Sequence, residues 1–218
     1  MDYSGLEKRA ARDCLDVFGA FHPEPDEALG LTLVLLGPKE PTFWDHFRQS
    51  PEYMDGKAHP MDRWSGRVIG ALARELSATA HFPFGPPPYA PFITWALRTR
   101  RAWSSPAGPL VHDRAGMMVS YRGALALRER LVIPAAEGRP CDACDTRPCL
   151  SACPVSALSD REGYDVAACH AWLDAQAECL DKGCLARRAC PVSQGFPRRE
   201  EQSAFHMAAF HKGAYAGT

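Results

Sequence analysis

The sequence predicts an α+β domain followed by a small cysteine-rich module. Apolar patterns typical of helices and of strands alternate upstream of residue 138, whereas eight of the nine cysteines lie between Cys141 and Cys190. Gly138 and Pro140 mark a boundary between these parts. We therefore expect three segments: an α+β domain over 1–138, the cysteine module over 139–196, and a closing helix within 197–218.

The first half of the domain contains four expected elements. "SGLEKRAARDCLDVFGAF" (4–21) has apolar residues near helical spacing behind a capping box of Ser4 and Glu7, which predicts a helix. "LTLVLLG" (31–37) is a short continuous apolar run, typical of a buried strand. A short helix is expected over 40–50, entered through Pro41, and an amphipathic helix over 62–78.

The second half begins with the Pro-rich sequence "HFPFGPPPYAP" (81–91), which predicts a loop. A helix is expected over 92–103, with Phe92, Ile93, Ala96 and Leu97 facing inward. "GPLVHDRAGMMVSYRGALAL" (108–127) predicts two strands joined by a turn at "HDRAG". "REEQSAFHMAAFHKG" (199–213) predicts the closing helix.

Composition excludes several classes of function. A formal charge of −1 argues against a dedicated nucleic-acid-binding protein. No apolar run reaches the roughly 18 residues of a membrane span, and the N-terminus lacks a signal-peptide pattern. We therefore expect a cytoplasmic protein without a membrane partner. In a reducing compartment, clustered cysteines indicate metal binding rather than disulfides.

The cysteines form two runs, and each run ends in Ala-Cys-Pro-Val-Ser (152–156 and 189–193). The first is Cys-x2-Cys-x4-Cys-x3-Cys-Pro and the second Cys-x9-Cys-x4-Cys-x5-Cys-Pro. Bacterial ferredoxins use a run of Cys-x2-Cys-x2-Cys-x3-Cys-Pro, whose fourth cysteine binds the other cluster. The second gap here is two residues longer. With the same crossover, two [4Fe–4S] clusters are expected, one held by Cys141, Cys144, Cys149 and Cys190 and the other by Cys153, Cys169, Cys179 and Cys184.

Two other metal arrangements stay open at this point. A structural zinc site also uses four cysteines, although zinc ribbons show two Cys-x2-Cys knuckles and this chain has one. A single cluster with spare thiols is the other alternative. Cys14 lies outside both runs and is expected to be a small buried hydrophobic residue.

The segment from "CDACDTRPCLSACPVSAL" through "RRACPVSQ" resembles bacterial ferredoxin-like proteins. It is also similar to the C-terminal part of epoxyqueuosine reductases and to the cluster-binding end of corrinoid reductive dehalogenases. The resemblance covers residues 139–195, about a quarter of the chain. It implies two [4Fe–4S] clusters that supply electrons to a cobalamin held by a nitroreductase-like α/β domain.

Upstream, "LTLVLLGPKEPTFWDHF" and "GPLVHDRAGMMVSYRGALAL" resemble segments of CblC-type cobalamin-processing proteins. The match to their "IHP-R-aromatic-Gly" and "IRG" stretches implies cofactor-binding roles for His112, Arg114 and Arg122, and a solvated turn arginine is an equal alternative for Arg114. Tyr89, in the Pro-aromatic loop, could line a flat cofactor, although such a loop more often packs on its own core. The upstream histidine motif of the CblC-type proteins and the catalytic acid region of epoxyqueuosine reductases have no counterpart here, so no catalytic residue is assigned.

Together these features predict an iron–sulfur redox protein. Electrons would pass through two [4Fe–4S] clusters to a corrinoid, or less readily a flavin, bound by the N-terminal domain. An external electron donor or acceptor protein is the implied partner. Whether the chain is an enzyme is open, and the resemblance points to a corrinoid-dependent or corrinoid-processing reductase. The alternative is a stand-alone electron carrier of ferredoxin type with no bound substrate.

Overall fold

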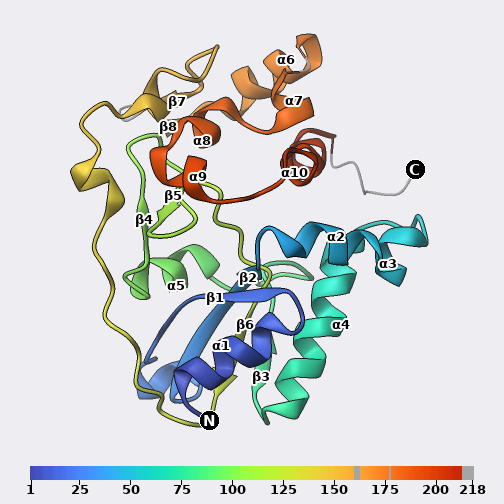
Figure 1. Ribbon diagram of the computed structural model, residues 1–218, viewed down its shortest axis with the longest axis vertical. Coiled ribbons are helices and arrows are strands. Elements are labelled where there is room, and N and C mark those ends of the chain that lie inside the picture. Colours follow the sequence, from blue (N-terminus) through green and yellow to red (C-terminus); the bar gives the residue numbers. More distant parts are fainter. Residues whose placement is uncertain (160–162, 177, 213–218) are drawn as a thin grey trace. The chain divides into compact units, whose positions relative to one another are not determined.

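The computed structural model describes residues 1–159, 163–176 and 178–212, and the chain forms two compact units (Figure 1). The first unit comprises residues 1–101 and 120–137, and the second comprises 102–119 and 138–218. Segment 102–119, which the sequence analysis included in the 1–138 domain, therefore groups with the cysteine segment. The fold class is α+β, as expected.

An antiparallel sheet of four strands forms the centre of the first unit, in the order β1-β2-β6-β3. The strands are β1 (Leu15–Phe21), β2 (Thr32–Pro38), β3 (Thr79–His81) and β6 (Gly123–Leu127). Every residue of β2 is buried, which explains its unbroken apolar sequence: a strand covered on both faces has no polar side. The prediction of a buried strand over 31–37 is confirmed.

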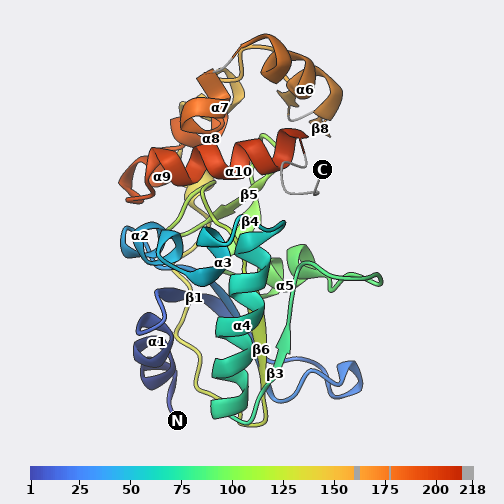
Figure 2. The same cartoon turned by 90° about the vertical axis from the view of Figure 1, so that its right-hand side faces the viewer.

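Three helices pack against this sheet, as Figure 2 shows for α1 and α4. Helix α1 (Tyr3–Ala11) contacts β1, α4 (Pro60–Glu75) contacts β6 and β3, and α5 (Phe92–Arg98) contacts β1. Arg9 on α1 donates to both carboxylate oxygens of Glu75 on α4, at 2.7 and 2.6 Å. Helix α4 buries the predicted stripe that contains Trp64, Ile69 and Leu72.

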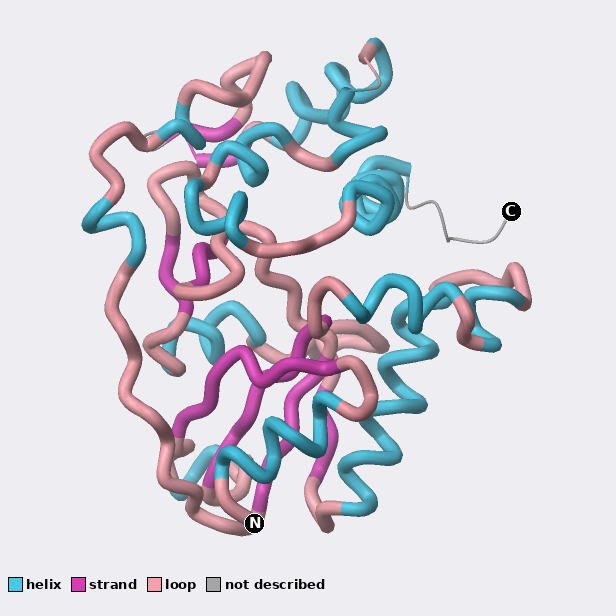
Figure 3. Tube along the Cα trace, viewed as in Figure 1, coloured by secondary structure: helices cyan, strands magenta, loops and turns pink. Residues whose placement is uncertain are grey.

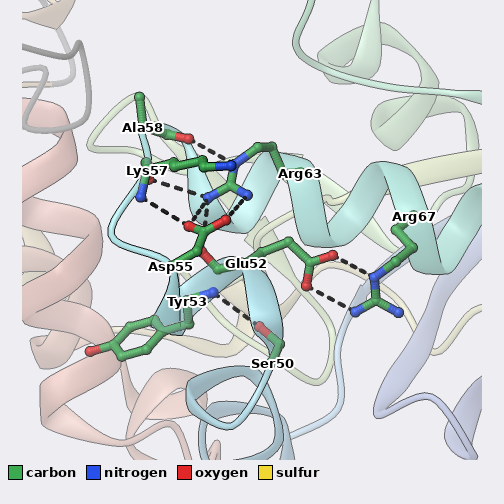
Figure 4. A network of polar contacts seen from close by, with 8 residues as sticks. All are labelled: Ser50, Glu52, Tyr53, Asp55, Lys57, Ala58, Arg63 and Arg67. Atoms are coloured by element: carbon green, nitrogen blue, oxygen red, sulfur yellow. Dashed lines mark hydrogen bonds and ion pairs between the residues drawn. The ribbon is translucent and has the colours of Figure 1, made fainter.

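A polar network fastens the start of α4 to the chain before it (Figure 4). Arg63 on α4 pairs with Asp55 at 2.7 Å and donates to the carbonyl oxygens of Glu52, Lys57 and Ala58. Arg67, one helical turn later, pairs with the Glu52 carboxylate, and this pairing lowers the pKa of Glu52. The network joins α4 to α3 (Pro51–Met54) and to the loop that follows α3. Two further elements, η1 (Pro25–Glu27) and α2 (Thr42–Arg48), precede α3 in the chain.

Three local predictions for residues 1–138 are wrong. The expected helix over 4–21 ends at Ala11, and residues from Leu15 onward form β1. The two strands expected in 108–127 do not pair with each other beyond their turn, because residues 123–127 form β6, which pairs with β2 and β3. In α5, Ile93 is 66% exposed and Leu97 40%, whereas Phe92 and Trp95 are buried.

The second unit consists of short elements joined by loops (Figure 3). Strands β4 (Ala102–Ser104) and β5 (Leu110–His112) form a hairpin, and β7 (Leu158–Ser159) pairs with β8 (Gly163–Tyr164). The helical elements of this unit are η2 (Pro140–Ala143), η3 (Pro148–Leu150), α6 (Val166–Ala175), α7 (Glu178–Lys182), α8 (Leu185–Ala189), α9 (Pro191–Gly195) and α10 (Glu200–Lys212). Helix α10 agrees with the predicted closing helix, and residues 213–218 lie outside the described residues.

One close approach joins the 102–119 segment to the cysteine segment. The expected turn at "HDRAG" is present, with His112 and Gly116 exchanging two backbone hydrogen bonds of 2.9 Å. Gly116 has φ +56°, and a Cβ there would lie 2.4 Å from the backbone nitrogen of Ser193. The buried Ser193 hydroxyl accepts a 2.9 Å hydrogen bond from the Met117 N–H. The turn and α9 are therefore in backbone-to-backbone contact.

Membrane-spanning helices are absent from the described part of the chain, where no helix combines sufficient length with sufficient apolar character.

Candidate metal centre

Four cysteines line the first pocket, a cavity of about 570 Å³ in the second unit. They are Cys141, Cys144, Cys149 and Cys190, the set expected from the crossover of the two cysteine runs. The 102–119 segment supplies Ser105, Pro106, Val111 and Met117 to the same wall. The first pocket therefore combines thiols from both cysteine runs with a segment that precedes both.

Local backbone geometry directs these thiols to one place. Cys141 lies in the 3₁₀ turn η2, and Cys144 is the residue directly after this turn. Arg147, with φ +39°, reverses the chain before Cys149 in η3. Cys190 is the single extended residue between α8 and α9, whose first residue is Pro191.

Burial affects the protonation of two thiols of the first set. It is the largest effect raising the pKa values of Cys141 and Cys149, and the neighbouring thiols Cys190 and Cys144 raise them further. Four adjacent thiolates, of which those of Cys149 and Cys190 are buried, would repel one another unless a cation lay between them. The electrostatics of the first pocket therefore suit thiols that become thiolates on binding a metal centre.

The other four cysteines line the second pocket. Cys153, Cys169, Cys179 and Cys184 meet there with apolar side chains of β7, α6, α8 and α10. This pocket is nearly closed, with a cavity of about 20 Å³, so its side chains must move apart to admit a cluster. Burial again raises the pKa values of Cys169 and Cys179.

Polar hydrogens point at two sulfurs of the second pocket. The Tyr164 hydroxyl donates to Cys169 Sγ at 3.3 Å, and the backbone N–H of Ala157 donates to Cys153 Sγ at 3.3 Å. Burial raises the pKa of Tyr164, and its bond to Cys169 raises it further, so the phenol keeps the proton that it donates. The same bond opposes the effect of burial on the pKa of Cys169 and favours its thiolate.

A shared apolar cluster connects the two sets of cysteines. It contains Cys149 and Cys190 of the first set, has Cys184 of the second packed against it, and includes Leu158 and Ala186 of the second pocket's lining. Cys184 and Cys190 flank the five-residue helix α8 and are about 9 Å apart along its axis at 1.5 Å per residue. The path between the two pockets is therefore short and apolar.

The residues expected to bind a corrinoid are divided between the two units. His112 and Arg114 lie in the second, and Arg122 and Tyr89 in the first. His112 is fully buried, and its Nδ1 accepts hydrogen bonds from the backbone N–H groups of Arg114 (3.1 Å) and Ala115 (3.3 Å). Asp113 Oδ1 lies 2.9 Å from the same nitrogen. His112 therefore shapes its own turn, and the Arg114 side chain is exposed.

Arg122 and Tyr89 have contrasting surroundings in the first unit. Arg122 pairs with Asp62, donates to the Ser65 hydroxyl at 3.1 Å and lies over the Phe84 ring at 5.6 Å. Burial lowers the pKa of Arg122, and the Asp62 carboxylate opposes this effect. Tyr89 is 67% exposed in the loop between β3 and α5.

Sequence reasoning missed the polar residues that line the two pockets. Ser105, in the turn between β4 and β5, is 6% exposed, and among the described residues its hydroxyl finds no hydrogen-bond partner. Within the same described ranges, the Trp172 indole N–H in the second pocket also finds none. Neither residue belongs to a motif. The available signal for Trp172 was its position one helical turn after Cys169, and nothing in the sequence linked Ser105 to the cysteines.

A histidine of α10 contacts the neighbouring helix α6. His211 uses both ring nitrogens toward α6, with Nδ1 2.8 Å from His170 Nδ1 and Nε2 3.0 Å from Asp174 Oδ1. His170 also stacks on Phe210. His211 therefore ties α10 to α6.

In residues 1–159, 163–176 and 178–212, no group of three or more His, Cys, Asp or Glu side chains is placed to hold one metal ion. Cys14 lies in the first unit and lines neither pocket.

Comparison of the chain with known protein families, with curated proteins and with solved structures finds no match.

Proposed function

We propose that this protein carries electrons through two [4Fe–4S] clusters. The observation that supports the proposal is that the eight clustered cysteines divide into two sets of four, each around its own pocket. In both sets the cysteine that precedes proline comes from the other run, as in two-cluster ferredoxins. The division of the pockets follows the crossover rule rather than proximity in the sequence.

The donor sets fit such clusters chemically. Each cluster, when bound, accepts and releases one electron at a time. The chain supplies thiolates, excludes water from Cys149, Cys179 and Cys190, and donates hydrogen bonds to sulfur from Tyr164 and Ala157. The apolar cluster between the pockets supports electron exchange between the two sites.

Zinc is the competing metal, and it requires its four sulfur ligands to lie closer together. Zn–S bonds of about 2.3 Å bring four tetrahedral sulfurs to about 3.8 Å from one another. The first set of cysteines instead surrounds a cavity of about 570 Å³. A cluster whose thiolates bind separate corners makes better use of such a cavity than a single ion does.

The first test is the content of iron and acid-labile sulfide in anaerobically purified protein, with EPR spectra after reduction by dithionite. About eight irons per chain and a reduced-cluster signal are expected. Zinc in place of iron would overturn the proposal. Cys14→Ser is the matched control and should keep all of the iron, because Cys14 lines neither pocket.

Paired substitutions test how the cysteines are assigned. Cys149→Ser with Cys190→Ser should remove one cluster, whereas Cys149→Ser with Cys153→Ser should remove both. The second pair is closer in sequence, so a model in which each run holds its own cluster predicts the reverse. Iron content per chain distinguishes the two assignments.

The electron acceptor remains a prediction from resemblance. Hydroxocobalamin added to the dithionite-reduced protein, after removal of excess dithionite, should undergo a spectral change if the chain reduces a corrinoid. An unchanged cobalamin spectrum with eight irons present would favour the stand-alone electron carrier and a partner protein as acceptor. The same experiment with free flavin tests the remaining alternative.

A further inference from the structure

The Ser105 hydroxyl is a buried donor without an acceptor in the part of the chain that the structure describes. Leaving a buried hydroxyl unsatisfied costs about 1–3 kcal/mol, so such groups usually have a partner in the functional protein. Ser105 lines the first pocket together with four cysteines. When a cluster occupies that pocket, thiolate and sulfide sulfur become available as acceptors in the cavity that Ser105 lines.

The backbone holds Ser105 in place. Its N–H donates to the carbonyl oxygen of Pro109 at 3.0 Å, and its carbonyl oxygen accepts from the Gly108 N–H at 3.0 Å, which closes the turn between β4 and β5. Arg139, which begins η2 and precedes Cys141 by two residues, donates to the carbonyl oxygen of Ser104 at 2.9 Å. The Ser105 turn is therefore fixed directly to the segment that carries Cys141.

The second pocket has a comparable donor. The Tyr164 hydroxyl already bonds to Cys169 Sγ at 3.3 Å. Hydrogen bonds to cluster sulfur or to its thiolates stabilise the more negatively charged reduced state, and their removal makes reduction harder.

We propose that each cluster site has its own hydroxyl donor to sulfur, Ser105 at the first and Tyr164 at the second, and that each raises the reduction potential of its own cluster. The inference rests on the proposed function and extends it. With one hydroxyl donor at each site, the reduction potential of each cluster can be changed separately by a residue outside the cysteine motifs. The donor at the first site comes from the 102–119 segment, which thereby acts on a cluster whose ligands all follow it in sequence.

The test is an EPR-monitored redox titration of the full chain, purified anaerobically, with iron counted in every sample. Ser105→Ala should shift the midpoint potential of one cluster to more negative values and leave the other unchanged. Tyr164→Phe should shift the other cluster in the same direction. Ser105→Thr keeps the hydroxyl and should restore the potential of the native protein, which a purely structural role of the side chain would not predict.

The cluster affected is identified in a Cys149→Ser background, which should retain the second cluster alone. There Tyr164→Phe should still shift the remaining potential, and Ser105→Ala should not. If the native protein binds about eight irons and Ser105→Ala shifts neither potential, the inference about Ser105 is overturned and the proposed function stands. Absence of iron from the native protein overturns both.

Loss of iron from the Ser105→Ala variant is also informative. Full iron content and a native potential in Ser105→Thr would then support the hydroxyl contact. Equal iron loss in both variants would show that the side chain matters for packing alone and would overturn the inference.

Discussion

Two serines at the same position of an identical pentapeptide have different structures and surroundings. Ser156 is exposed, adopts φ +51° and ends a turn in which its N–H donates to the carbonyl oxygen of Cys153. Ser193 is 4% exposed, lies in helix α9 and accepts a hydrogen bond from Met117. The five residues are the same, so the contacts made by the rest of the chain determine each local structure.

This difference predicts unequal effects of one substitution. Ser193→Ala leaves the buried N–H of Met117 without its acceptor and should lower the free energy of unfolding of the second unit by about 1–3 kcal/mol. Ser156→Ala is the matched control and should change it little, because that side chain is in solvent. Anaerobic urea denaturation measures both, and equal losses would contradict the assignment of the Ser193 contact.

The partly buried ion pair of Arg122 and Asp62 gives a second prediction at the residue scale. Asp62→Ala removes the counter-charge of the Arg122 guanidinium and should destabilise the first unit by about 1–3 kcal/mol, less than for a fully buried pair, because Asp62 is 33% exposed. Glu75→Ala breaks the more exposed pair with Arg9 and should have a much smaller effect. Thermal unfolding of both variants compares them. Similar shifts in Tm would mean that Arg122 is more solvated than its burial indicates.

At the scale of elements, a helix or strand can be predicted from the sequence when its hydrophobic pattern fits only one type of secondary structure. Helix α4 and strand β2 are examples, because a long amphipathic stripe and a short run buried on both faces are distinctive. Leu15, Val17 and Phe18 fit both a helical stripe and a buried strand, and pairing with β2 decides for the strand. The same limit applies to 108–127, whose partners are distant in the sequence.

Some residues of the candidate site could be predicted from the sequence and others could not. The spacing of the cysteines, with the crossover rule, predicts the two sets that the pockets contain. Ser105 could not be predicted, because tertiary folding brings a turn from another part of the sequence to the first pocket. Short-range spacing predicts which cysteines lie together, whereas the other residues around a pocket come from elements that carry no motif.

The contact between the 112–116 turn and α9 can be tested with two glycines of one segment. Gly116→Ala and Gly108→Ala both place a Cβ at positive φ, which costs about 1–2 kcal/mol. The new Cβ at 116 also meets the Ser193 backbone at 2.4 Å, whereas the one at 108 has open space. Gly116→Ala should therefore be clearly the more destabilising in anaerobic denaturation and should lower iron content. Equal effects would mean that the turn does not pack closely on α9.

At the scale of the whole molecule, the two units have different kinds of core. The first contains large buried side chains such as Phe43, Phe47, Trp64 and Leu72. The apolar cluster of the second consists largely of alanine, cysteine and single larger residues, around elements of a few residues each. So small an apolar core supplies little stability by itself, and metal binding commonly supplies the remainder in small domains.

If the second unit binds the two proposed clusters, their removal should unfold this unit and spare the first. The chain passes between the units at 101–102, 119–120 and 137–138, so the boundary does not follow a single cut in the sequence. After iron is removed by chelation under reducing, anaerobic conditions, hydrogen–deuterium exchange should rise in 138–212 and also in 102–119. It should stay slow in the buried strands β2 and β6, although β6 follows the 102–119 segment directly in sequence. Continued protection of 102–119 in the iron-free protein would show that this segment is stabilised by the first unit. Ser105 would then not belong to the proposed metal site.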